Sequence, residues 1–132
     1  MHETTINVRW SELDPYHHVN HAVYMAYFES ARIEALEAVG WGMKALGDRG
    51  YMILVAEASV RFRKPAGAGD TLTVQTRVVE LKAATSRWRQ ELLRDGEVLV
   101  SAEFIGAVTD LDGRPRRMPD ELRETLERRL GD

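Results

Sequence analysis

The side chains with the clearest chemical potential lie together in one short polar segment near the N-terminus. It contains one carboxylate, Asp14, and three histidines, His17, His18 and His21, within eight residues. A carboxylate can act as a nucleophile or a general base, and imidazoles can transfer protons or bind a metal ion. This segment is therefore the first candidate for a catalytic site.

Asn20 lies where the polar segment meets a helical pattern, and we expect it to be the helix N-cap. An N-cap side chain accepts a hydrogen bond from an amide of the first turn. We expect the amides of His21, Ala22 and Val23 to be unpaired at the positive end of the helix dipole. Together with Asp14, such amides could stabilise the oxyanion that forms when a carbonyl is attacked.

Length and composition narrow the class of protein. The chain has 132 residues and a net charge of -3, which predicts one domain spanning residues 1–132 and argues against nucleic-acid binding. There is no cysteine, so a thiolate nucleophile and a Cys-based zinc site are excluded. Residues 1–7 are too short and polar for a signal peptide, and no apolar run approaches a membrane span. A cytoplasmic location is expected.

Hydrophobic periodicity predicts a strand, a long helix, four strands and a terminal helix. The predicted strands are 4–11, 51–63, 71–81, 85–94 and 97–109, the helices are 22–39 and 119–130, and a short helical turn lies in 41–50. Asp95-Gly96 is a strong signal for a tight hairpin. The order predicts an α+β fold with a mainly antiparallel five-stranded sheet.

The long helix has an apolar face with several alanines, which suits close packing against a sheet. The predicted members of that face are Tyr24, Tyr27, Phe28, Ala31, Ala35, Ala38 and Val39, with Gly40 ending the helix. Strand 51–63 is expected to carry one unbroken apolar face, formed by Met52, Leu54, Ala56, Ala58, Val60 and Phe62. We expect the sheet to wrap around the helix and its exposed edges to favour a homodimer.

Two stretches resemble the hotdog-fold acyl-CoA thioesterases, in particular the 4-hydroxybenzoyl-CoA thioesterase and YbgC-like branch. They are Asp14-Pro15-x-x-His18-Val19-Asn20-His21-x-x-Tyr24-x-x-Tyr27-Phe28-Glu29-x-Ala31-Arg32 and Val60-Arg61-Phe62-x-x-Pro65-Ala66-x-x-Gly69-Asp70. The resemblance implies a hotdog fold, with the sheet wrapped around a long central helix. It also implies dimers or tetramers with sites at the dimer interface, and hydrolysis without a metal or cofactor.

The resemblance also assigns roles to individual residues. Asp14 falls on the family's catalytic aspartate, as nucleophile or general base. His21 falls where YbgC-like members have a site histidine and where the benzoyl-CoA enzymes use a backbone amide to polarise the thioester carbonyl. Glu12 stands where the family commonly has another Asp, and His18 occupies a position that is often His.

Plainer interpretations stay open for each of these residues. Asp14 before a proline is a common turn former. His17 and His21 are four residues apart, but zinc needs a third ligand and His17 precedes the helix cap. His17 is then solvent-facing and His18 braces the loop. Tyr24, Tyr27 and Phe28 are explained by the core alone.

Coenzyme A carries phosphates, so a site for it should offer Arg or Lys near the cleft mouth. The candidates are Arg61, Arg63, Lys64, Lys82 and Arg87, each equally well explained as a solvated charge. Glu57 and Ser59 could line the cleft from a partner subunit, or be ordinary exposed strand residues. With His18, Asn20 and Ala22, these residues complete the expected substrate-binding set.

The sequence therefore predicts an acyl-CoA thioesterase in which Asp14 attacks or activates water at the start of the 22–39 helix. Two alternatives remain: a hydratase or dehydratase of the same fold, and a non-catalytic acyl-thioester-binding protein. The sequence does not define the acyl chain length, nor does it separate CoA from carrier-protein thioesters.

Overall fold

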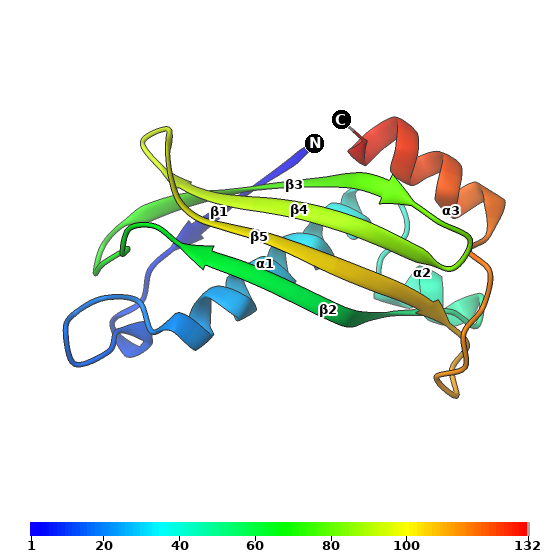
Figure 1. Cartoon of the computed structure of the whole chain (residues 1–132), viewed down its shortest axis with the longest axis horizontal. Coiled ribbons are helices and arrows are strands. Elements are labelled where there is room, and N and C mark those ends of the chain that lie inside the picture. The colour runs from blue at the N-terminus through cyan, green and yellow to red at the C-terminus, as the bar shows by residue number, and fades with distance from the viewer. Residues whose placement is uncertain (132) are drawn as a thin grey trace.

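A computed structural model describes residues 1–131, and Asp132, the last residue of the predicted domain, lies outside the described residues. Five strands form one antiparallel sheet in the order β1-β3-β4-β5-β2 (Figure 1). The strands are β1 (His2–Asn7), β2 (Met52–Phe62), β3 (Thr71–Leu81), β4 (Thr85–Arg94) and β5 (Glu97–Thr109). The predicted α+β fold with an antiparallel sheet is confirmed.

The helices lie at one face and one end of this sheet. They are α1 (His21–Ala38), α2 (Met43–Asp48) and α3 (Asp120–Thr125), which continues as a π-helical turn, Leu126–Leu130. α1 packs mainly against β1 and β3, so the β2 edge is less covered. No helix within residues 1–131 is long and apolar enough to cross a membrane.

The buried face of α1 follows the predicted spacing over most of its length. The predicted side chains that are buried are Tyr24, Tyr27, Phe28, Ala31 and Ala35. Burying each large one contributes about 1.5–3 kcal/mol. Ala38 is exposed instead, and Leu36 is buried. The helix ends as predicted at Gly40, whose φ of 85° lies in the left-handed region.

The first strand is shorter than predicted because the chain turns at Arg9. The Arg9 amide donates to Oε1 of Glu12 at 2.7 Å, and the Glu12 amide donates to the Arg9 carbonyl at 3.0 Å. These bonds form a 3-10 turn over Trp10–Glu12. Trp10 consequently leaves the sheet, and its side chain is 75% exposed.

The unbroken apolar face predicted for β2 is wrong, because the strand contains a bulge. Its register with β5 shifts between Val55 and Glu57, and one extra residue reverses the alternation of faces. Phe62 pairs with Val100, whereas Leu54 pairs with Ala107 on the opposite face of β5. The apolar residues of β2 thus divide between the two faces.

Asp70 holds the turn between β2 and β3. Its Oδ2 accepts hydrogen bonds from the Gly67 amide and from Nη1 of Arg94, both at 2.8 Å. The Gly67 amide, and after it Arg94, hold the pKa of Asp70 below its usual range. His18 forms a β-bridge with Gly67, so this turn supports the polar segment that contains Asp14.

We predict that Asp70→Asn lowers the free energy of unfolding by about 1 kcal/mol at neutral pH. A depressed pKa contributes stability above the ordinary aspartate value, about 3.9, and that contribution is lost as the pH falls through the folded-state value. Urea unfolding of variant and wild type should therefore converge in acid. The control is Asp48→Asn, which breaks an exposed pair with Lys44 and should change little. A gap that persists unchanged in acid would contradict the assignment.

Candidate functional site

The segment between the 3-10 turn and α1 is closed on itself by hydrogen bonds that centre on Asp14. The Asp14 amide donates to the His18 carbonyl at 2.7 Å. Its Oδ1 accepts from the amides of Tyr16 at 2.8 Å and His18 at 3.1 Å. His17 takes a φ of 62°, a left-handed conformation that this tight loop imposes on a non-glycine residue. Within residues 1–131, Oδ2 of Asp14 makes no hydrogen bond.

Glu12 joins this loop to α1. Its Oε1 accepts from the hydroxyl of Tyr27 at 2.7 Å, and its carbonyl accepts from the Asn20 amide at 2.8 Å. Burial, and then the Glu12 carboxylate, raise the pKa of Tyr27, which keeps the phenol protonated as a donor. Glu12 therefore has a bracing role in this structure.

Asn20 is the N-cap of α1, as predicted, but it uses two of the amides that were expected to be unpaired. Its Oδ1 accepts from Ala22 at 2.9 Å, and its carbonyl accepts from Val23 at 2.9 Å. In the described residues the His21 amide is left without a hydrogen-bond partner. The expected group of three unpaired amides is therefore corrected to one.

A cavity of about 410 Å³ lies over this helix start. It brings together five of the predicted site residues from three parts of the chain: Asp14, His18, His21, Arg63 and Lys64. Asp14 is half-buried, and the other four are exposed. Residues that carry a carboxylate, an unpaired amide and two cationic groups thus line one open cavity, which is an arrangement suited to an acyl compound with an anionic tail.

Tyr24 is a wall of this cavity that sequence reasoning assigned only to the core. Its hydroxyl accepts from the Ala66 amide at 3.0 Å, and its ring lies 5.6 Å from that of Phe62. Burial raises the pKa of Tyr24, the Ala66 amide opposes this, and the nearby Asp14 adds to it. Tyr24 follows His21 by three residues, so both lie on one side of α1. This spacing could have linked Tyr24 to the site.

The remaining predicted site residues do not line this cavity. Asn20 and Ala22 are engaged in the helix cap. Glu57, Ser59 and Arg61 are exposed along β2. Lys82 follows β3 at the end opposite the 65–70 turn, with its Nζ 3.9 Å from Oε1 of Glu80.

The structure also shows the surroundings of the candidate phosphate contacts and of the histidines considered as metal ligands. Lys64 pairs with Glu97 at 2.6 Å, so its ammonium is already partly engaged. Arg87, the further candidate for phosphate, lies near Glu80 at 3.7 Å and Glu103 at 3.5 Å. The His17 ring faces Trp10, and no group of three His, Asp or Glu side chains suited to a metal ion occurs among residues 1–131.

Comparison with known proteins gives consistent matches over almost the whole chain. The family described as the thioesterase-like superfamily matches residues 8–126. The chain is 30% identical over 124 residues to the acyl-acyl carrier protein thioesterase ATL3 of Arabidopsis thaliana, covering 92% of this chain but only 65% of ATL3. It is 28% identical over 128 residues to the long-chain acyl-CoA thioesterase FadM of Escherichia coli, covering 95% of this chain and 96% of FadM.

A solved structure supports the same grouping. A probable thioesterase from Bartonella henselae matches with a TM-score of 0.85 and 29% identity, covering 89% of this chain and 98% of that chain. The family that the two sequence motifs predicted is confirmed by these matches. This chain belongs to the thioesterase-like superfamily.

Proposed function

We propose that the protein hydrolyses an acyl-CoA thioester to a free acid and coenzyme A. One observation carries the proposal: Oδ2 of Asp14 and the amide of His21, both unpaired within residues 1–131, belong to residues of the same cavity. The similarity to FadM, a long-chain acyl-CoA thioesterase, and to ATL3, an acyl-acyl carrier protein thioesterase, supports a thioester as the substrate.

In the proposed reaction the thioester carbonyl lies over the first turn of α1, with its oxygen accepting from the His21 amide. Oδ2 of Asp14 either attacks the carbonyl carbon or takes a proton from the water that attacks it. The C–S bond then breaks, and the sulfur leaves as a thiolate that takes up a proton. On the covalent route, water hydrolyses the resulting anhydride. Both routes use the carboxylate form of the Asp14 side chain.

We infer a hotdog arrangement for the fold, one domain over residues 1–132 with α1 as the axis of the curved sheet. The packing of α1 on β1 and β3 and the buried aromatic face of the helix support it. We also infer a cytoplasmic enzyme. Arg63 and Lys64, at the exposed side of the site cavity, are the proposed contacts for the CoA phosphates.

We further propose that two copies pair through β2, either as a dimer or within a tetramer. β2 is an edge strand with exposed apolar side chains, including Leu54 at 44%, Val55 at 51% and Phe62 at 51%. A long apolar edge of this kind readily pairs with another strand. Pairing would bring Glu57, Ser59 and Arg61 of one copy toward the site of the other, and Lys82 would serve only from a partner.

The first test is Asp14→Asn. The asparagine carbonyl oxygen can still accept from Tyr16 and His18, so the loop should keep its shape while the charge is lost. We expect kcat/KM for acyl-CoAs to fall about 100-fold or more. Thiol release across short, long and aromatic acyl-CoAs, and acyl-carrier-protein thioesters, measures this. Asp112→Asn, in an exposed turn, is the control. A folded Asp14→Asn variant with near-full turnover would reject the role.

His21 offers a way to separate its amide from its ring. His21→Pro removes the amide hydrogen at the first helical position, where proline is well tolerated, and Asn20 already has a compatible extended ψ of 134°. His21→Ala removes the ring and keeps the amide. We expect His21→Pro to be about 100-fold slower than His21→Ala. Equal rates for the two variants would argue against the amide as the oxyanion donor.

Pairing through β2 is tested by Ala58→Lys, at an exposed position of this edge strand. A charge on this edge should produce a species of the 15.0 kDa chain mass, and the wild type a multiple of it, by light scattering. Turnover should fall together with assembly if the partner completes the site. Met25→Lys is a matched control, because Met25 is also exposed but lies on α1, outside the strands. A wild type that elutes as a monomer with full activity would refute the arrangement.

A further inference from the structure

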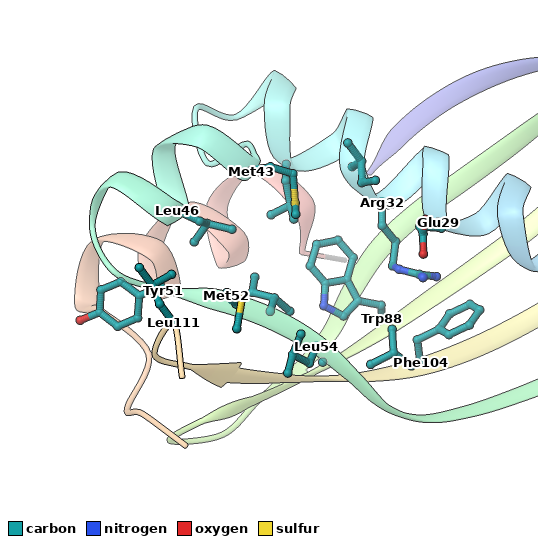
Figure 2. A pocket seen from close by; sticks show the side chains of 16 residues that line it. Glu29, Arg32, Met43, Leu46, Tyr51, Met52, Leu54, Trp88, Phe104 and Leu111 are labelled. Carbon is teal, nitrogen blue, oxygen red and sulfur yellow. The ribbon is translucent and has the colours of Figure 1, made fainter. Parts of the chain in front are cut away.

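A second cavity, of about 590 Å³, lies between α1, α2 and the strands β2, β4 and β5 (Figure 2). Its walls are mainly apolar, and they include Leu36, Leu46, Met52, Leu54, Trp88 and Phe104. Cavities of this size and character typically bind small apolar molecules or parts of them. Nothing in the proposed reaction at Asp14 uses these residues.

Two charged side chains from adjacent turns of α1 interrupt the apolar lining. Among the described residues of the wall, Glu29 and Arg32 are the charged ones, and Figure 2 shows both directed toward the cavity. The Arg32 guanidinium lies over the Phe104 ring, with Cζ 4.0 Å from the ring centroid. Burial lowers the pKa of Arg32 to about 10, against the opposing effect of Glu29, so it remains charged at neutral pH.

Arg32 is held in place by a neutral partner. Its Nη1 donates to Oε1 of Gln90 at 2.9 Å. The Gln90 amide is fully buried and donates in turn to the Phe28 carbonyl and to Oγ1 of Thr76, both at 3.0 Å. In the part of the chain that the structure describes, no carboxylate comes within ion-pair distance of Arg32. Several guanidinium donors are therefore fixed in position without an acceptor.

The two cavities lie along the same pair of elements. The site cavity includes His21 at the start of α1 and Phe62 at the end of β2, and the second includes Glu29 and Arg32 further along α1 and Met52–Val55 at the start of β2. From His21 to Glu29 the helix rises about 12 Å. An extended chain advances about 1.3 Å per bond, since three bonds span 3.8 Å, so about nine bonds cover this rise.

We propose that the second cavity binds the distal part of an aliphatic acyl chain that carries a hydroxyl group, with Arg32 and Glu29 as the residues that select it. This inference rests on the proposed thioesterase function. A hydroxyl can accept from Arg32 and donate to Glu29 at the same time. A distal carboxylate would be repelled by Glu29, and a plain alkyl chain would offer no acceptor to the guanidinium donors of Arg32 that Gln90 does not use. A single aromatic ring is too short to reach them.

The test compares kcat/KM for 10-hydroxydecanoyl-CoA and decanoyl-CoA. We expect the wild type to favour the hydroxylated substrate about tenfold or more, as a hydrogen bond to a charged group allows. A 6-hydroxyhexanoyl-CoA and hexanoyl-CoA pair should show no such preference, because its hydroxyl falls short of Arg32. Arg32→Met should bring the ratio for the longer pair close to one, and Arg32→Lys should restore part of it.

The control and a second variant keep the test decisive. Arg49→Met removes a guanidinium that also lies over an aromatic ring, 4.5 Å from the centroid of Trp41, but outside this cavity, and it should leave the ratio unchanged. If Arg32→Met fails to fold, Glu29→Leu alters an exposed residue and should still lower the ratio. Hydrolysis of both decanoyl substrates at equal rates overturns this inference alone, as it would if a second copy filled the cavity. Hydrolysis of neither decanoyl substrate also overturns this inference, whereas the proposed function is overturned only if no acyl-CoA of the panel is hydrolysed.

Discussion

The two hydrogen bonds of the Ala66 peptide groups are the contacts on which the site depends. The carbonyl of Ala66 accepts from the Val19 amide at 2.8 Å, and its amide donates to the Tyr24 hydroxyl at 3.0 Å. Ala66 is 1% exposed, so losing either bond would leave a buried polar group unsatisfied. Through these bonds the turn after β2 is joined to both the polar loop and α1. Arg63 and Lys64 thereby reach the same cavity as Asp14.

Around this junction, three carboxylates each accept two hydrogen bonds on one oxygen, but from different kinds of partner. Glu12 receives the Arg9 amide and Tyr27 hydroxyl, and Asp70 receives the Gly67 amide and the Arg94 guanidinium. Both are bracing groups. Asp14 accepts only from two amides of its own loop, and it is the one of the three that lines the site cavity. Its place in the cavity wall, and not the number of its donors, distinguishes this acid from the two bracing ones.

Much of the fold could be predicted from local pattern. The period of α1 and its Asn20 cap located the helix to within one residue at each end, and Asp95-Gly96 marked the β4–β5 hairpin, where both residues have positive φ. The early end of β1 depends on the local turn between Arg9 and Glu12, which the apolar alternation of the segment concealed. The bulge in β2 could not be predicted, because it depends on pairing with β5, far along the chain.

The candidate site was predictable to a lesser extent. Asp14, His18 and His21 are close in sequence, so a local pattern sufficed to group them. Arg63 and Lys64 were named only among several scattered cations, because grouping them with Asp14 needs the strand order. Lys82 was named in the same way, but the antiparallel path of β3 carries it to the other end of the sheet. Tyr24 was assigned to the core because the apolar face of α1 explains its burial, although its place one turn after His21 also puts it beside the site.

The bulge between Val55 and Glu57 affects how the β2 edge can associate with other copies of the chain. A regular, flat strand can add identical copies of itself without limit, which is the geometry of amyloid fibrils. One extra residue bends the strand and breaks the even spacing of its free amides and carbonyls. The irregularity disfavours unlimited fibrillar stacking at this edge while permitting a closed, symmetrical union. The same eleven-residue strand can thus resist fibril formation and still pair with one second copy.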